Sequence, residues 1–371
     1  MEIDPKKVKK YEIDLARGIA KADGPEDHKQ LMEALALLKS GNLPPTPNHG
    51  GPLEVGFVPK DKGPKLLEVL DKLFLLKKQL KPSTRLAYTN VITEFCAYIK
   101  KSHIGLILPT DVTKYQEYLA EKNKNTPRTI DNKIATIRTL YNFAIKMAYF
   151  DGKNPAELRA LVSTKDKKKG GWAVYTLDEI KRLYAHKVIN QEKQADSDYY
   201  WCILLALFTG CRISEITGLD KSQIMNDGKL TYIYVTDSKT AAGIREIPIL
   251  PKLMALGFDD FVKSKSGKLF KYQERLGKGS GNAVSKKFLR TKVELGINRP
   301  KLVFHSLRKF LNNYLMNNDV SLEIRCQLIG HEIENVNVQT YTETIPLQKI
   351  ANTIFPSLEK LANEIELTYK L

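Results

Sequence analysis

The sequence predicts a mainly α-helical protein with a small β-sheet. Apolar residues recur at intervals of three and four through residues 66–162, which is the spacing of helices with one buried face. Two segments, 229–236 and 244–250, are instead rich in β-branched and aromatic residues and are separated by DSKTAAG, as expected for a hairpin. With 371 residues, of which 42% are hydrophobic, the chain is long enough for two or three domains with their own cores.

Two stretches without apolar periodicity divide the chain. Residues 41–64 are rich in proline and glycine, and the charged segment STKDKKKGGW (163–172) also contains glycine, so both are interpreted as linkers. The predicted organisation is an N-terminal extension with its linker (1–64), a helical domain (65–165), a mixed domain (173–346) and a helical tail (347–371).

Helix starts are marked by short-range signals. In the helical domain one helix begins after Pro82 and Ser83, and another has Thr126 as its N-cap and proline at its first position. Thr176 and Glu179 form a capping box at the start of the mixed domain. The buried faces expected from the spacing are Leu31, Leu35 and Leu38 in the extension, Tyr88, Ile92, Phe95 and Ile99 in the first helix, and Ile130, Ile134, Ile137, Tyr141 and Ala144 in the second.

The balance of charge points to a polyanionic partner. Lys and Arg number 59 against 42 Asp and Glu, which gives a formal net charge of +17 and a pI near 9.4. Nucleic acid is the leading candidate. Its phosphates could meet basic residues on the exposed helix faces, and a merely solvated face is the alternative for each of them. These residues are Lys77, Lys78, Arg85, Lys124, Arg128 and Lys133.

Several other classes of protein are disfavoured. The longest apolar run, Trp201 to Phe208, is too short to cross a bilayer, and the start MEIDPKKVKK lacks the apolar stretch of a secretory signal. The four cysteines form no CxxC pair, and neither an HExxH nor a GxxxxGKS/T motif occurs. We therefore expect a cytoplasmic protein with reduced thiols, no bound metal and no cofactor.

Three sequence segments contain residue types that suit chemistry at a phosphodiester: TGCRISEITGL (209–219), HSLRKFLNNYL (305–315) and LIGHEIENVNVQTYTE (328–343). Displacement of an oxygen at phosphorus builds negative charge on the non-bridging oxygens, and preorganised cations stabilise that charge. Arg212 and Arg308 suit this task because a guanidinium group can bind two oxygens and keeps its proton. His305 lies one helical turn before Arg308 and can add a donor, and Glu215 can orient Arg212 through an ion pair.

In this order the segments resemble the tyrosine recombinase (integrase) family over roughly residues 66–345. The resemblance implies a catalytic set of Arg212, Lys239, His305, Arg308, His331 and Tyr341. It implies that Tyr341 attacks a DNA phosphate to give a 3′-phosphotyrosine without ATP, and that Lys239, in the hairpin turn, is the general acid.

The resemblance also implies an architecture and a biological setting. The helical domain would be a SAM-like core-binding domain that clamps double-stranded DNA together with the catalytic domain. Such an enzyme would assemble as a homo-tetramer on a specific attachment site. The N-terminal extension favours an integrase of a mobile element, such as an archaeal virus or plasmid, over a chromosome-resolving enzyme.

Some assignments keep alternatives. Tyr341 lies ten residues after His331, whereas Thr340 has the commoner family spacing. Gly330 and His331 could simply end a helix. Lys229, Arg245 and Lys252 also lie in or beside the hairpin. For the whole protein, the rival functions are a type IB topoisomerase-like relaxing enzyme and a DNA-binding accessory protein without catalysis. A metal-dependent nuclease is disfavoured because no convincing set of carboxylates accompanies the basic motifs.

Overall fold

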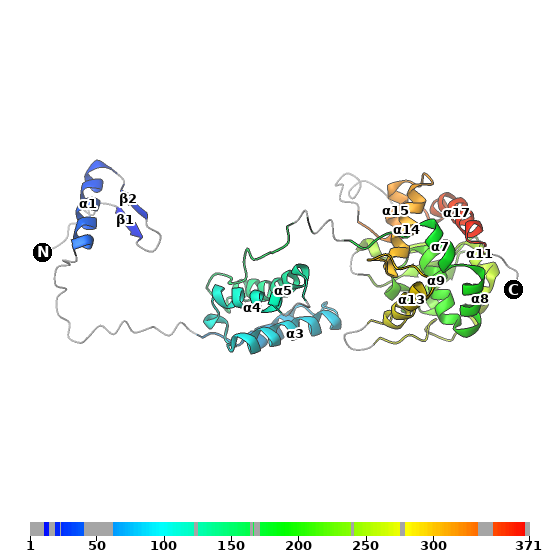
Figure 1. Ribbon diagram of the computed structural model, residues 1–371, viewed down its shortest axis with the longest axis horizontal. Helices are drawn as coiled ribbons and strands as arrows, with labels where there is room; N and C mark the ends of the chain where they lie inside the picture. Colours follow the sequence, from blue (N-terminus) through cyan, green and yellow to red (C-terminus); the bar gives the residue numbers. More distant parts are fainter. Residues whose placement is uncertain are drawn as a thin grey trace. The chain divides into compact units, whose positions relative to one another are not determined.

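The computed structural model describes residues 11–14, 19–22, 24–40, 62–121, 125–163, 166, 171–238, 241–274, 279–332 and 344–367. In the N-terminal unit, β1 (Tyr11–Asp14) and β2 (Ile19–Ala22) form an antiparallel hairpin that is followed by α1 (Pro25–Ser40) (Figure 1). The helix predicted in this segment is confirmed, and the hairpin is an additional feature.

Four helices surround one core in the described part of the helical domain. They are α2 (Leu66–Leu76), α3 (Pro82–Ile99), α4 (Pro109–Glu121) and α5 (Pro127–Lys146), with a short 3-10 turn η2 (Ile104–Leu106) between α3 and α4. The start of α5 is the predicted one, because the Thr126 side chain accepts a hydrogen bond from the Thr129 amide at 3.3 Å. All five residues predicted for the buried face of α5 are buried.

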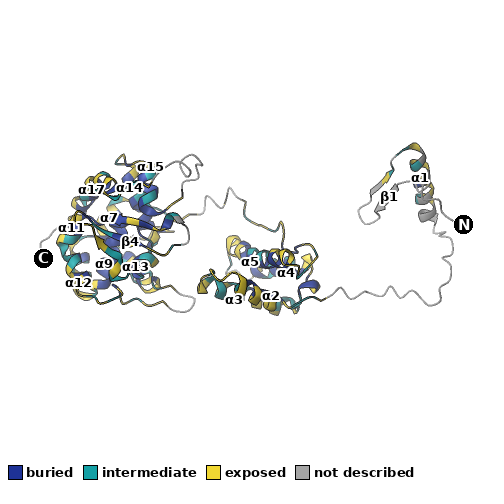
Figure 2. Cartoon of the chain, turned by 180° about the vertical axis from the view of Figure 1, so that it is seen from behind, coloured by how far each residue is buried: buried dark blue, intermediate teal, exposed yellow. Residues whose placement is uncertain are grey.

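The mixed domain surrounds a central helix, α9 (Ser197–Thr209), which is buried on every side from Asp198 onward (Figure 2). The helices before and after it are α7 (Leu177–Leu183), α8 (His186–Ala195), α10 (Ile213–Thr217), α11 (Pro251–Leu253), α12 (Asp259–Lys263), α13 (Asn282–Glu294), α14 (His305–Met316) and α15 (Leu322–Ile329). Short turns η3 (Lys221–Gln223), η4 (Ala241–Gly243) and the π-helical η5 (Met254–Phe258) connect them. The capping box at the start of α7 is confirmed: Thr176 Oγ1 accepts from the Glu179 amide at 3.2 Å, and Glu179 Oε2 accepts from the Thr176 amide at 2.8 Å.

A three-stranded antiparallel sheet of order β3-β4-β5 lies beside these helices. The predicted hairpin is confirmed by β4 (Thr231–Val235) and β5 (Arg245–Pro248), in which Ile233 pairs with Ile247. A third strand, β3 (Ile224–Asn226), was not predicted. Its three residues are too few to show an alternating pattern.

The predicted C-terminal helix is α17 (Leu347–Glu364). Its apolar face, which includes Ile350, Ile354 and Leu358, is buried in the same hydrophobic core as α9. At its end, Lys252 Nζ donates to Asn363 Oδ1 at 2.8 Å. The helix therefore completes the core of the mixed domain. None of the helices in the described part of the chain combines the length and the apolar character needed to cross a bilayer.

Candidate active site

Arg212 is placed by the turn between α9 and α10. Gly210 ends α9 in a left-handed conformation (φ 65°), and Arg212 then becomes the N-cap of α10. Glu215 holds it twice, since its carboxylate accepts from the Arg212 amide at 2.8 Å and from Arg212 Nη1 at 2.7 Å. The Arg212 side chain remains 36% exposed, so its outer edge is accessible to a ligand.

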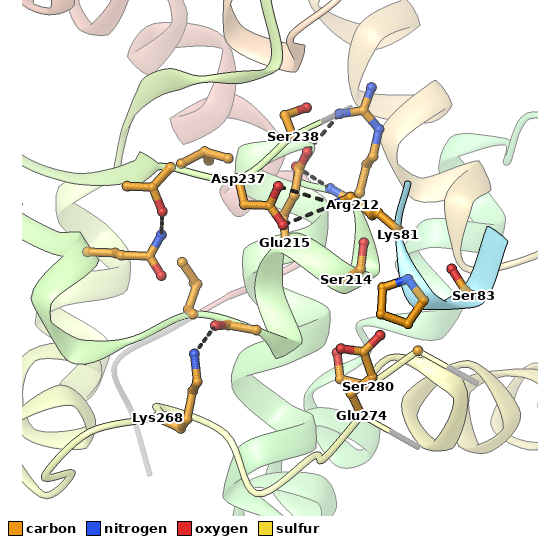
Figure 3. A pocket seen from close by; sticks show the side chains of 17 residues that line it. Lys81, Ser83, Arg212, Ser214, Glu215, Asp237, Ser238, Lys268, Glu274 and Ser280 are labelled. Atoms are coloured by element: carbon orange, nitrogen blue, oxygen red, sulfur yellow. Dashed lines mark hydrogen bonds and ion pairs between the residues drawn. The ribbon is translucent and has the colours of Figure 1, made fainter. Parts of the chain in front are cut away.

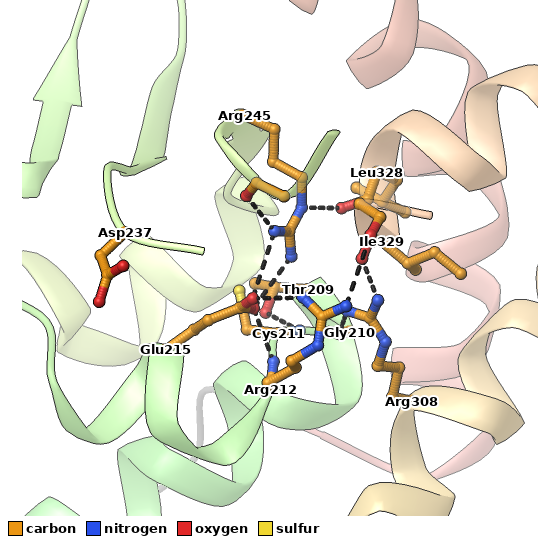
Figure 4. Close-up of polar contacts among 12 residues, drawn as sticks. Thr209, Gly210, Cys211, Arg212, Glu215, Asp237, Arg245, Arg308, Leu328 and Ile329 are labelled. Atoms are coloured by element: carbon orange, nitrogen blue, oxygen red, sulfur yellow. Dashed lines mark hydrogen bonds and ion pairs between the residues drawn. The ribbon is translucent and has the colours of Figure 1, made fainter. Parts of the chain in front are cut away.

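Arg308 is a buried arginine on α14 that joins the ends of two helices (Figure 4). Its Nη1 donates to the Gly210 carbonyl at 2.7 Å, and its Nη2 donates to the Ile329 carbonyl. Its Nε is buried and has no hydrogen-bond partner among the described residues. Burial, together with the charges of Arg212 and Arg245, lowers the pKa of Arg308 to about 10. These features suit a bound anion, which would stabilise the guanidinium.

The two arginines face the same short segment. Arg212 Nη2 lies 3.5 Å from the Gly330 carbonyl, one residue after the carbonyl that Arg308 contacts. Figure 4 shows their guanidinium groups side by side. Like charges so close together repel each other, and this repulsion favours a negatively charged ligand between them.

His305 and His331 lie beside these arginines. His305 is the first residue of α14, one turn before Arg308. His331 follows Gly330, which ends α15 in a left-handed conformation (φ 64°), and the His331 amide donates to the Cys326 carbonyl at 3.0 Å. Loss of surrounding water and the charges of Arg308 and Arg212 lower the pKa of His331 to about 4 and also lower that of His305. Both shifts favour the neutral form of the imidazole.

A third arginine, Arg245, lies at the centre of the cluster. The sequence suggested it only as an alternative cation beside the hairpin. Arg245 begins β5 and is buried, and its Nη2 forms an ion pair with Glu215 Oε2 at 3.0 Å. The signal that could have found it is strand alternation, because Arg245 is in phase with the buried Ile247 and Ile249. A charged residue in that phase requires a buried partner.

The site continues beside α10 into a pocket with a polar lining. Arg212, Ser214, Lys268 and Ser280 are among the residues that line it (Figure 3). Ser280 Oγ lies 2.7 Å from Thr217 Oγ1, which ties the loop before α13 to α10. Hydroxyl groups and cations at these positions suit the sugar-phosphate backbone of a nucleic acid.

The structure therefore brings together four of the predicted catalytic residues, namely Arg212, His305, Arg308 and His331. Two others, Lys239 and Tyr341, lie outside the described residues. Glu215, which the sequence predicts to orient Arg212, forms the expected ion pair with it.

The predicted DNA-binding residues of the helical domain have different surroundings. Arg85 donates to the carbonyls of Leu80 and Lys78, both at 3.1 Å, so it also holds the chain after α2. Lys133 pairs with Glu94 at 2.7 Å. The other exposed candidates are Lys77, Lys78 and Arg128, whereas Lys124 lies outside the described residues. Contact of any of them with DNA stays a prediction.

Comparison with known proteins places these features in a family. Residues 174–346 match the Phage integrase family, and residues 66–149 match the N-terminal SAM-like domain of phage integrases. The tyrosine recombinase XerD of Rickettsia bellii is 24% identical over 297 residues, which cover 75% of this chain and 94% of the relative. The tyrosine recombinase XerC of Caldanaerobacter subterraneus is 24% identical over 326 residues, covering 81% of this chain and 89% of the relative.

Solved structures share the fold. A lambda integrase tetramer bound to a Holliday junction aligns with a TM-score of 0.57 and 19% identity, covering 91% of this chain and 95% of that chain. The Tn1549 transposon integrase in complex with a circular intermediate DNA aligns with a TM-score of 0.54 and 16% identity, covering 80% and 99%. The mainly helical fold with a small sheet that the sequence predicts is confirmed. With its two matched domains and its order of Arg, His, Arg and His, the chain belongs to the phage integrase family of tyrosine recombinases.

Proposed function

We propose that the chain is a site-specific DNA recombinase that cuts and rejoins DNA strands through Tyr341. The observation that carries this proposal is the convergence of Arg212 and Arg308 on the adjacent carbonyls of Gly330 and Ile329, with His305 and His331 beside them. Cations fixed in this way match the charge that develops on a phosphodiester during displacement.

Each residue then has a role in a balanced transesterification. The Tyr341 oxygen attacks phosphorus, so that a 3′-phosphotyrosine bond forms while the bond to the 5′ oxygen breaks. A neutral imidazole, from His305 or His331, accepts the phenol proton, and Lys239 donates a proton to the leaving 5′ oxygen. Arg212 and Arg308 stabilise the charge on the non-bridging oxygens. The covalent intermediate keeps a phosphodiester, and rejoining therefore needs no ATP.

The partner in this proposal is double-stranded DNA with a specific attachment site, bound by four protomers on two sites. DNA-bound integrases among the structural neighbours, one of them a tetramer, support this assembly. A net charge of +17 supports a polyanionic partner. We place the protein on DNA in the cytoplasm and infer that it derives from a mobile element, such as an archaeal virus or plasmid.

The test is covalent trapping. The substrate is a nicked DNA duplex whose sequence is taken from the region around the gene. Cleavage releases a short fragment from this duplex, so the wild-type protein should stay covalently joined to the DNA. Tyr341→Phe should bind the same duplex with unchanged affinity and give no adduct, because it lacks the attacking oxygen. Thr340→Val is the matched control for the other possible nucleophile and should still form the adduct. An adduct with Tyr341→Phe would move the nucleophile to another residue.

A second assay separates the rival functions. Joining of strands from two different DNA molecules, each with the attachment site, is expected of a recombinase. Relaxation of supercoils without such joining would instead favour the topoisomerase-like alternative. Binding without any covalent adduct would favour the accessory protein.

A further inference from the structure

Arg245 is charged, central and closed off from any substrate. Its side chain is 3% exposed. Nε donates to the Leu328 carbonyl at 2.8 Å, Nη1 donates to the Gly243 carbonyl at 2.8 Å, and Nη2 pairs with Glu215 (Figure 4). Each guanidinium nitrogen is thus directed at a protein group. Any effect of Arg245 on the reaction must therefore pass through the groups that it holds.

The first of these groups is the Glu215 carboxylate, which Arg245 shares with Arg212. Oε1 accepts from Arg212 Nη1 at 2.7 Å and lies 3.5 Å from Arg245 Nη1, while Oε2 accepts from Arg245 Nη2 at 3.0 Å. Burial by itself raises the pKa of Glu215, but the hydrogen bonds from Arg245 and Arg212 and the charge of Arg245 outweigh burial and lower it. One negative charge is thus divided between two guanidinium groups. Without Arg245, the whole charge of Glu215 would act on Arg212.

The second group is the end of α15. Arg245 holds the Leu328 carbonyl, and the next carbonyl, that of Ile329, accepts from Arg308. The following residue, Gly330, packs against Arg245 so closely that a Cβ atom there would lie 2.9 Å from Arg245 Nη1. His331 comes directly after this glycine. One side chain therefore links the sheet, the Glu215–Arg212 pair and the segment that presents His331.

We propose that Arg245 is a positioning residue of the recombinase: it orients Arg212 and keeps the charge of Arg212 available to DNA by sharing Glu215, and it fixes the segment that carries His331. This inference rests on the proposed function for its catalytic consequence. Its structural consequence, the division of Glu215 between two arginines, is measurable without DNA.

The catalytic test is a double-mutant cycle on single-turnover cleavage of the nicked duplex at saturating protein. Arg245→Met should lower the cleavage rate constant by ~100-fold, the size expected if Arg212, held by the whole charge of Glu215, no longer stabilises the charge on the phosphate. DNA affinity should fall much less than the rate constant, because Arg245 itself does not reach the surface and Arg212 supplies only one of many phosphate contacts. Adding Glu215→Gln to Arg245→Met should raise the cleavage rate constant again by about tenfold, because the carboxylate that binds Arg212 then has no charge. A residue needed only for packing would give no such recovery.

The DNA-free test is NMR of the Arg212 side chain. The Nε–Hε signal of Arg212 is assigned by its loss in Arg212→Lys. This signal should shift in Arg245→Met, because both carboxylate oxygens of Glu215 are then available to Arg212. It should return toward its original position in the double variant. If the wild-type protein forms no covalent adduct with DNA, the proposed function fails. The NMR signal of Arg212 would still show whether Arg245 and Arg212 share Glu215. If neither the rate nor the signal shows coupling between positions 245 and 215, the inference is overturned.

Controls separate positioning from folding. Arg299 and Glu179 form a more exposed arginine–carboxylate pair in the same domain, with Nη2–Oε2 and Nε–Oε1 distances of 2.6 and 2.7 Å. Arg299→Met should lower the melting temperature and leave the cleavage rate constant and the Arg212 signal unchanged. Should Arg245→Met fail to fold, Arg245→Lys takes its place. Lysine keeps the positive charge but lacks the planar guanidinium group that bonds to several partners, so this folded variant should cleave DNA more slowly than the wild type. Cleavage at the wild-type rate would overturn the inference.

Discussion

At the scale of single residues, the cations of the active site determine the protonation of their neighbours. Loss of water around the ring, together with the charges of Arg308 and Arg212, lowers the pKa of His331 from its usual value near 6.5 to about 4. A neutral imidazole can accept the phenol proton at neutral pH, whereas an imidazolium cannot. The cluster that we propose to bind phosphate would thus also keep a base available for the proposed nucleophile.

Bound DNA should reverse this shift. A phosphate between the arginines offsets their charge, so the pKa of His331 should rise from about 4 when DNA binds. Because the bound state then holds the proton more tightly than the free state, DNA affinity should increase as the pH falls through the interval between the two pKa values. Titration of the His331 ring signal by NMR, with and without a short duplex, measures both values.

His331→Asn is the control for this linkage. The variant lacks the titrating group, so it should bind DNA with a weaker dependence on pH than the wild-type protein. Equal pKa values for His331 in free and bound protein would show that the phosphate does not lie near this residue.

At the scale of elements, helix ends position the proposed catalytic groups. Arg212 caps the start of α10, His305 begins α14, and His331 follows the end of α15. Gly210 and Gly330 both adopt left-handed conformations that let two helices stop close to Arg308. The carbonyls left free at these helix ends are the groups that the buried arginines bind.

The C-terminal helix should contribute to stability as a core element. Leu358 on α17 is fully buried among residues of the mixed domain. Leu358→Ala should therefore lower the free energy of unfolding by ~2–5 kcal/mol, as expected for truncation of a buried leucine. Urea unfolding followed by circular dichroism measures this change.

A matched variant on the same helix tests the interpretation. Lys360 is exposed, and Lys360→Ala should change the free energy of unfolding by less than about 0.5 kcal/mol. Similar effects of the two substitutions would mean that α17 does not pack as described.

At the scale of the whole molecule, the excess of positive charge should dominate DNA affinity. Each phosphate contact releases a bound counterion, so affinity should fall steeply as salt rises. Lys77 and Lys78 are exposed and lie directly after α2. The double variant Lys77→Gln/Lys78→Gln should reduce the slope of log affinity against log salt by about 2, one for each lost contact.

A control with the same change of charge isolates contact from net charge. Lys349 and Lys360 are exposed on α17. Lys349→Gln/Lys360→Gln should leave the salt slope nearly unchanged, as measured by fluorescence anisotropy over a range of salt concentrations. Equal slopes for the two double variants would remove Lys77 and Lys78 from the DNA interface.

The sequence by itself determined the features that depend on residues close together in the chain. The N-cap at Thr126 and the capping box at Thr176 were predictable because each acts over three residues. The β4–β5 hairpin followed from local composition. His305 and Arg308 were placed on one side of a helix by their spacing alone, and Glu215 was placed beside Arg212 in the same way.

Tertiary structure decided which distant groups meet. Arg308 contacts the ends of α9 and α15, and Arg245 contacts Glu215 and Leu328, across 21 to 98 positions of the chain. Local spacing carries no information about such pairs, because they form only when packing excludes water and leaves each buried charge its partner. The sequence therefore supplied the chemical groups of the site. Folding alone determined that Arg245 shares Glu215 with Arg212.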